Sequence, residues 1–230
     1  NKTTIFKLEE TAAKTGLRIN KEKTKVIKIN SRSMSNIRLS EGELEEVTSF
    51  TYLGSIVNTT GGTEQDIKAR IGKARTAFSL LNKLWRSREI STRTKVRLFN
   101  TNVKSVLLYG SETWRTTVRS DLKIQSCLNN FLRRILRIWW PDKIRNEDLW
   151  ERTDQIPPTL QVKKKKWTWV GHVTRKHPSS ITRQALKWNP QGKRKRGRPR
   201  NTWRRSLHKE LEEQGYKWKD LEEKAQNRVR

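Results

Sequence analysis

The spacing of apolar residues changes at Thr63, and the change separates two kinds of predicted structure. After Thr63 the apolar positions recur every three or four residues, at Ile67, Ile71, Ala74, Phe78, Leu81 and Trp85. Such spacing places the side chains in one stripe along an α-helix. Before Thr63 most apolar residues alternate with polar ones, which is typical of strands. The sequence therefore predicts a mainly α protein that begins with a small α+β part.

The first sixty residues are predicted to contain one helix and several short strands. Residues 3–15 carry apolar side chains at helical spacing and are followed by Gly16, a common residue just beyond a helix C-terminus. Alternation then predicts strands at 17–19 and 25–29, and a weaker strand at 37–39. These elements are too few to make a whole α+β domain.

Residues 49–57 are predicted to form a tight β-hairpin. Phe50, Tyr52 and Ile56–Val57 are aromatic or β-branched residues, which favour strands. Gly54 interrupts them and permits a sharp bend, and a cluster of turn residues follows. The hairpin therefore ends the α+β part, which we place at residues 1–62.

Residues 63–141 are predicted to form a helical bundle. The first helix follows Thr63, the second follows the start signal Ser91–Thr92, and the third runs from Ser120 to Pro141. One apolar stripe of each helix would supply the core. We expect arginines such as Arg70 and Arg75 to project from the remaining surface.

Residues 142–230 are predicted to form a basic, tryptophan-containing helical region. Helices are expected at 146–153, from Pro157–Pro158 onward, at 203–211 and at 218–225. The second of these carries four successive lysines, which cannot all face the same way on a helix, directly before two tryptophans that could pack inward or remain exposed: Lys163, Lys164, Lys165, Lys166, Trp167 and Trp169.

The charge of the chain indicates a polyanionic partner. The 52 Lys and Arg residues exceed the 23 Asp and Glu residues by 29. Residues 1–60 carry a net charge of +3, residues 61–140 one of +12 and residues 141–230 one of +14. An excess this large is more than solvation of helix surfaces requires, so we expect nucleic acid as the partner. No apolar run approaches the roughly 18 residues of a membrane-spanning helix, and we expect no membrane association.

Neither a metal site nor a disulfide is predicted. Cys127 is the only cysteine, and its place in an apolar helical pattern suggests a small core residue. His172 and His177 have no second pair of ligands nearby, so a structural role is favoured over metal binding. Because the chain begins at Asn1 and its only methionine is Met34, we expect it to be a fragment of a longer protein.

The loop at residues 190–201 is predicted to be exposed. Its sequence GKRKRGRPR, at 192–200, has too many charges and too few apolar residues to be buried. Its centre, Arg196–Gly197–Arg198–Pro199, is similar to the AT-hook, whose arginines enter narrow A·T-rich minor grooves. Short basic runs of this kind, here also including Arg200, serve equally as nuclear localisation signals. We therefore expect a nuclear protein.

Together, the motifs resemble the C-terminal part of the reverse transcriptase of non-LTR retrotransposons. GLRINKEKT at 16–24 resembles the palm motif that follows the polymerase active site, and FTYLG at 50–54 resembles the primer-grip hairpin. The helices from Thr63, with LYGSETW at 108–114, resemble the thumb and its extension. WVGHV at 169–173 and GKRKRGRPRNTW at 192–203 resemble the end of such reading frames. The likeness covers nearly the whole chain.

The chain departs from this family in the residues that carry catalysis. The family's polymerases hold two Mg²⁺ ions with carboxylates, two of which form an adjacent Asp-Asp pair. No Asp-Asp pair occurs in this chain, and its six aspartates are scattered: Asp66, Asp121, Asp142, Asp148, Asp154 and Asp220. We therefore expect no catalytic residue and no cofactor here. The resemblance places the Mg²⁺ ligands, with the fingers and most of the palm, in the complete parent polymerase.

The resemblance also implies roles for individual residues. Tyr52 and Gly54 of the hairpin would help to hold the 3′ end of the primer. Lys23 occupies the position of a lysine proposed to protonate the leaving pyrophosphate. The arginines and lysines of the helices would follow a primer–template by its backbone. The full set of candidate nucleic-acid-binding residues is Lys23, Phe50, Tyr52, Gly54, Arg70, Arg75, Arg133, Arg134, Arg137, Lys163, Lys164, Lys165, Lys166, Arg196, Arg198 and Arg200.

Two functions remain open from the sequence. The first is a reverse transcriptase fragment that binds an RNA template, an RNA–DNA hybrid or duplex DNA without synthesising anything. The second is a non-enzymatic nuclear protein that binds duplex DNA through the AT-hook-like loop.

Overall fold

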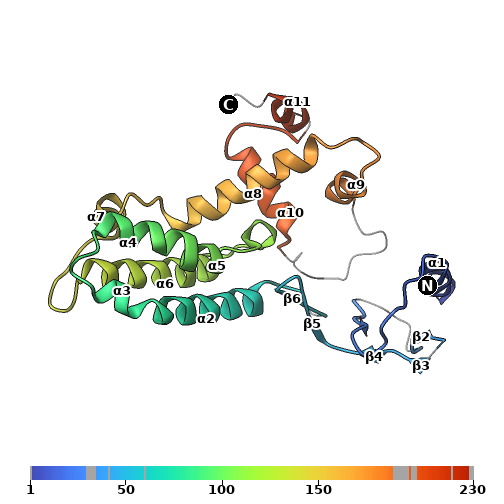
Figure 1. The fold of residues 1–230 in the computed structure, drawn as a ribbon. Helices are drawn as coiled ribbons and strands as arrows, with labels where there is room; N and C mark the ends of the chain where they lie inside the picture. The colour runs from blue at the N-terminus through green and yellow to red at the C-terminus, as the bar shows by residue number, and fades with distance from the viewer. Residues whose placement is uncertain are drawn as a thin grey trace. The chain divides into compact units, whose positions relative to one another are not determined.

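The computed structural model describes residues 2–29, 35–40, 42–59, 61–188, 197, 201–218 and 220–227. Helices account for 58% of the chain and strands for 8%, which confirms the mainly helical fold with small sheets and a helical C-terminal region. The chain divides into two compact units, Asn1–Asp66 and Ile67–Arg230, which are described separately (Figure 1).

The first unit combines one helix with three two-stranded sheets. Its elements are α1 (Lys2–Lys14), β1 (Lys25–Val26), β2 (Arg38–Leu39), β3 (Gly42–Glu43), β4 (Glu45–Glu46), β5 (Ser49–Tyr52) and β6 (Ser55–Asn58). Strand β1 pairs in parallel with β4, β2 pairs antiparallel with β3, and β5 pairs antiparallel with β6. Helix α1 is joined to the end of β2 because the carboxylate of Glu9 accepts a hydrogen bond from the backbone N–H of Ser40 at 3.2 Å.

The β5–β6 hairpin confirms the predicted tight turn. Tyr52 pairs with Ser55, so the loop contains only Leu53 and Gly54. Both adopt left-handed backbone conformations, with φ of 49° and 83°. Two successive residues with positive φ match the right-handed twist of the two strands. The hairpin is anchored to the start of the next helix by Asp66, whose Oδ1 accepts from the N–H of Ile56 at 3.0 Å.

Two strand predictions in this unit are wrong or too long. Residues 17–19 form no strand, because alternation produces a strand only when another segment pairs with it, and no described residue does so. The chain instead enters a turn in which Asn20 Oδ1 accepts from the N–H of Lys23 at 2.9 Å. The strand expected at 25–29 covers only Lys25–Val26, since β4 offers only two pairing residues.

The second unit is helical. Its elements are α2 (Glu64–Leu80, which begins in the first unit), α3 (Asn82–Arg86), α4 (Thr92–Phe99), the π-helix η1 (Asn100–Lys104), α5 (Ser105–Leu107), the 3₁₀-helix η2 (Ser111–Thr113), α6 (Val118–Leu136), α7 (Asn146–Arg152), α8 (Pro158–Thr174), α9 (Ile181–Lys187), α10 (Trp203–Glu212) and α11 (Asp220–Gln226). Figure 1 shows α2, α4 and α6 running side by side. Within the described ranges, no helix is both long and apolar enough to cross a membrane.

Aromatic stacking holds α2, α3 and α6 together. The ring of Phe78 stacks on Trp85 with centroids 5.0 Å apart and on Phe131 with centroids 4.5 Å apart. All three side chains are buried. Trp85 Nε1 also donates to the backbone oxygen of Phe78 at 2.7 Å, which closes the junction between α2 and α3. These contacts position the surface described below.

Helix α6 differs from its predicted bounds at both ends. It begins at Val118, two residues before the predicted start at Ser120, because Thr117 and Ser120 form a reciprocal capping box. It ends at Leu136, not at Pro141, because Arg137 adopts a left-handed conformation with φ of 59°. The Arg137 N–H then bonds back to carbonyls of the last turn, which closes the helix.

The C-terminal helices form a smaller apolar cluster of their own. Val170 and Val173 of α8 pack with Leu186 of α9 and Leu207 of α10. Trp167 and Trp169 are partly buried against this cluster, so they lie toward protein and not fully in solvent. Helix α9 was not predicted, because its seven residues contain too few apolar positions to reveal a helical period.

Candidate nucleic-acid interface

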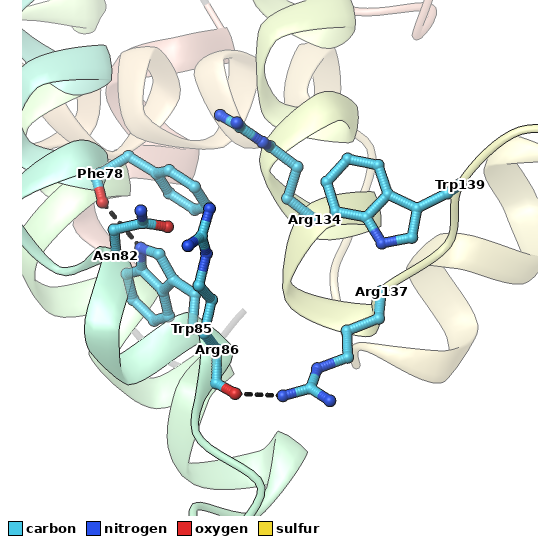
Figure 2. Close-up of a pocket in the computed structure, with 7 residues that line it drawn as sticks. All are labelled: Phe78, Asn82, Trp85, Arg86, Arg134, Arg137 and Trp139. Atoms are coloured by element: carbon cyan, nitrogen blue, oxygen red, sulfur yellow. Dashed lines mark hydrogen bonds between the residues drawn. The ribbon is translucent and has the colours of Figure 1, made fainter.

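A cavity between α3 and the end of α6 gathers arginines and aromatic rings. Its volume is about 170 Å³. Figure 2 shows Arg134, Arg137 and Trp139 on one side, and Asn82, Trp85 and Arg86 on the other. The full lining is Phe78, Asn82, Trp85, Arg86, Arg134, Arg137 and Trp139.

Arg137 is fixed in this cavity by the end of α3. Its Nη2 donates to the backbone oxygens of Arg86 and Ser87, as the dashed line to Arg86 in Figure 2 shows. Those carbonyls stand at the C-terminus of α3, where partial negative charge favours a cation. A guanidinium has five N–H donors, and Nη2 alone makes these contacts. The left-handed turn that ends α6 thus places a positive charge across from α3.

Arg134 lies between this cavity and a second one. Its guanidinium carbon is 5.8 Å from the centroid of the Phe78 ring. The second cavity has a volume of about 260 Å³, and Phe78 and Arg134 line both. Its other lining residues are Arg75, Ser79, Cys127, Asn130 and Phe131. The two cavities therefore follow each other along the α2–α6 face.

The arginines of these cavities carry charge that the protein does not neutralise. Arg75, Arg86, Arg134 and Arg137 are all exposed. Within the part of the chain that the structure describes, none of the four forms an ion pair with a carboxylate. We name this set, with its two cavities, the arginine face. Burial raises the pKa of the Cys127 thiol even though Arg75 lies beside it, so the thiol at this face stays protonated near neutral pH.

Arg70 and Arg133, two further candidates, have roles within the fold. The expectation that Arg70 projects from the surface is wrong: its side chain is only 6% exposed, and its guanidinium lies 4.4 Å from the centroid of the Tyr109 ring. Arg133 is half-buried, and its Nη2 donates to Asn146 Oδ1 at 2.9 Å and to the Ile144 oxygen at 3.3 Å. Both cations therefore contact protein groups.

The four successive lysines divide between the protein and the solvent. Lys163 and Lys164 are exposed. Lys165 Nζ donates to the backbone oxygen of Leu108 at 2.9 Å. Lys166 is buried and forms an ion pair with Glu210 of α10. Only the first two lysines are thus placed to meet a partner from solution.

Other candidates lie outside the arginine face. Tyr52 is 63% exposed on the hairpin, Phe50 is also exposed, and Gly54 stands in its turn. Lys23 is exposed in the turn after α1. These four belong to the first unit. Arg196, Arg198 and Arg200 of the basic loop lie outside the described residues.

The described residues do not fit the two Mg²⁺ ions of a polymerase. No three His, Cys, Asp or Glu side chains cluster as metal ligands anywhere in the described ranges. Two of the aspartates have partners within the fold: Asp66 Oδ1 accepts from the N–H of Ile56 at 3.0 Å, and Asp148 pairs with Arg145 at 3.1 Å. We assign no catalytic step to this chain.

The chain is similar to a nematode protein that is named as transposon-derived. It is 28% identical over 218 residues to an uncharacterized, transposon-derived protein of Caenorhabditis elegans, F52C9.6, with 90% of this chain and 77% of the relative covered. This similarity fits a transposon-related origin. Residues 77–109 match a domain of unknown function, DUF6451. No solved structure matches the chain.

The DUF6451 match includes one wall of the cavity. Residues 77–109 contain Phe78, Asn82, Trp85 and Arg86, while the opposite wall comes from the end of α6. Sequence reasoning missed Arg86, Asn82 and Trp139 as candidates. The pair Trp139–Trp140, which follows the arginines of α6 and precedes Pro141, was the available signal. Large aromatic side chains usually contact other groups, so two adjacent tryptophans beside a helix end indicate a contact surface.

Proposed function

We propose that the chain is the nucleic-acid-binding C-terminal part of a non-LTR retrotransposon reverse transcriptase. It binds primer–template through the arginine face and the basic C-terminal region, and it contains no catalytic carboxylates. The observation that carries the proposal is the set of four exposed arginines, Arg75, Arg86, Arg134 and Arg137, for which the described residues supply no carboxylate partner.

Arginines that lie close together without carboxylate partners repel one another, so they favour binding of a polyanion that neutralises their charge. Phosphate oxygens match the fork of guanidinium donors better than they match single lysine ammonium groups. A groove between helices lets several of these forks reach successive phosphates of one strand. The binding should therefore depend on backbone charge more than on sequence.

The polymerase origin is supported by the order of the motifs along the chain and by the transposon-derived relative. Within this proposal, the β5–β6 hairpin corresponds to the primer grip, and the helices α2–α6 correspond to the thumb. The two metal ions and their ligands belong to the part of the parent polymerase that precedes these motifs. The protein acts in the nucleus, where its template and target DNA meet.

The test compares two ligands and three variants. The chain is titrated with a primed RNA template and with an A·T-rich DNA duplex of equal length, at fixed salt, by fluorescence anisotropy. One variant, R75Q/R86Q/R134Q, removes three charges of the arginine face. Its matched control, R93Q/R119Q/R152Q, removes three exposed arginines of α4, α6 and α7 that line neither cavity. A third variant lacks residues 192–200.

We expect the arginine-face variant to lose much more affinity for the primed template than the control variant loses. The loop deletion should weaken binding to both ligands only partly. If the deletion abolished all binding while R75Q/R86Q/R134Q bound normally, the function would be that of a DNA-binding protein using the AT-hook-like loop.

A further inference from the structure

We propose that the cavity between α3 and the end of α6 binds an unpaired nucleotide, with its base on Trp139 and its flanking phosphates at Arg86, Arg134 and Arg137. The inference rests on the proposed nucleic-acid binding and deepens it, because it names the part of the nucleic acid that this site takes. The phosphates of a duplex could contact the arginines, but its paired bases would not stack on Trp139.

Trp139 provides the aromatic surface. It is 57% exposed although it lines the same cavity as the buried pair Phe78 and Trp85. Figure 2 shows its indole on the α6 side of the cavity, close to Arg134 and facing the α3 wall. An exposed indole at the edge of a positively charged cavity is suited to stacking with a base.

The three guanidinium groups supply the phosphate contacts. Arg137 is held by the carbonyls of Arg86 and Ser87, so its charge is fixed and not free to swing away. Arg86 stands across the cavity, and the guanidinium of Arg134 lies next to Phe78, at the end of the cavity away from that of Arg137. None of the three is neutralised by a carboxylate among the described residues, so the site retains its full attraction for an anion.

Asn82 adds a group that can read the edge of a base. Its side-chain amide has two donors and an acceptor, and it makes no hydrogen bond with any other described side chain or backbone group. The volume of about 170 Å³ is smaller than the roughly 300–1,000 Å³ of drug-sized ligand pockets. It therefore suits one ring system and not a whole dinucleotide cofactor.

The geometry favours an unpaired strand over both a duplex and a free nucleotide. In a duplex the bases stack on each other and present only their edges, so an aromatic face has nothing to stack on. The second cavity continues beyond Arg134, and its lining includes Arg75. A neighbouring nucleotide of the same strand can occupy it, with the connecting phosphate at Arg134.

The test uses the whole chain and an RNA–DNA hybrid in two forms, blunt or with a two-nucleotide unpaired overhang. Dissociation constants are measured by fluorescence anisotropy at one salt concentration. We expect the overhang to improve affinity about tenfold, since stacking of a base on an aromatic side chain contributes on this scale. Trp139→Ala should remove this gain, so that the blunt and the overhang hybrid bind this variant with equal affinity, and Trp139→Phe should retain most of the gain.

The matched control is Trp140→Ala, which removes a more exposed tryptophan from the neighbouring position that does not line the cavity. It should keep the full overhang effect. Circular dichroism on all variants checks that they are folded. Adenosine monophosphate, added as a competitor at the concentration of the overhang ligand, should displace little of it.

Four results would overturn the inference. If the wild-type chain bound blunt and overhang hybrids equally, the site would not take an unpaired nucleotide, although the proposed function would stand. The same conclusion follows if Trp140→Ala removed the overhang effect as completely as Trp139→Ala. If adenosine monophosphate competed fully, the cavity would be a site for free nucleotides. Absence of binding to every nucleic acid would contradict the proposed function as well.

Discussion

Lys166 and Glu210 form an ion pair in which the lysine side chain is 1% exposed and the glutamate side chain 10%. The pair joins α8 to α10, and the second carboxylate oxygen of Glu210 accepts from Trp167 Nε1 at 2.9 Å. Helix α10 is thus attached to α8 by a charged contact shielded from water. Such a pair is sensitive to the loss of one partner, because the remaining charge stays buried.

Replacing Glu210 by Gln is therefore expected to destabilise the chain by about 3–5 kcal/mol, since it leaves the Lys166 charge uncompensated. Replacing both residues, in K166M/E210Q, should cost less than the single change. The free energy of unfolding is measured by urea denaturation. The control is Glu213→Gln, which breaks an exposed contact with Lys209 of 3.8 Å and should change stability by less than about 1 kcal/mol. Equal effects of the two single changes would show that burial of the pair is unimportant.

Lys104 should make stability depend on pH in the alkaline range. Burial, assisted by the nearby charge of Lys165, lowers the pKa of Lys104 to about 8, and its Nζ donates to Gln155 Oε1. The unfolded chain binds this proton up to its ordinary pKa near 10.5, so between about pH 8 and 10.5 the unfolded state holds more protons. Stability should therefore rise with pH in this window.

The measurement compares the free energy of unfolding of the wild type and of Lys104→Met between pH 7 and pH 11. The difference between them isolates Lys104 from the other titrating lysines. It should shift in favour of the wild type as pH rises from about 8 to about 10.5 and stay constant below pH 8. A difference that does not vary with pH would mean that Lys104 titrates normally.

The capping box of α6 should contribute measurably to stability. Thr117 Oγ1 accepts from the Ser120 N–H at 3.2 Å, and Ser120 Oγ accepts from the Thr117 N–H at 2.8 Å. Thr117→Ala removes one half of this exchange and should cost about 1 kcal/mol in thermal or urea unfolding. Thr117→Ser retains the hydroxyl and should cost much less. Equal losses in the two variants would contradict the cap as the cause.

The two-residue turn of the hairpin should be improvable at Leu53. This side chain is 74% exposed, yet its backbone has φ of 49°, a conformation that asparagine adopts more easily than leucine. Leu53→Asn creates the Asn-Gly pair that type I′ hairpins prefer and should slow amide hydrogen exchange across β5 and β6. Gly54→Ala should do the opposite, because φ of 83° is costly for any residue with a Cβ atom. Unchanged exchange in both variants would rule out turn geometry as the determinant.

The sequence predicted those parts of the fold that depend on local periodicity. The stripe from Ile67 to Trp85 identified α2, and the turn residues around Gly54 identified the hairpin, because each pattern repeats within a few residues. The end of α6 was missed since it depends on the left-handed backbone of Arg137 alone. Arg70 could have been placed correctly: it follows Ile67 by three residues and precedes Ala74 by four, which puts it on the buried side of the helix.

The candidate site was only half predictable for a different reason. Arg75, Arg134 and Arg137 were identified from charge, but Arg86 and Arg137 are 51 residues apart and meet only when α3 packs against α6. No local sequence pattern predicts a contact between residues so far apart in the chain. In the same way, nothing in the run of four lysines reveals that Lys166 finds Glu210 on a helix 44 residues away.

If the arginine face binds the nucleic-acid backbone, its arginines should contribute to the salt dependence of binding. Affinity for an RNA–DNA hybrid is measured over a range of salt concentrations for the wild type, for R75Q/R86Q/R134Q and for the control R93Q/R119Q/R152Q. Each lost phosphate contact lowers the magnitude of the log–log slope by about 1. We expect the slope of log affinity against log salt concentration to be about three units shallower for the arginine-face variant and nearly unchanged for the control. Identical slopes for all three proteins would contradict it.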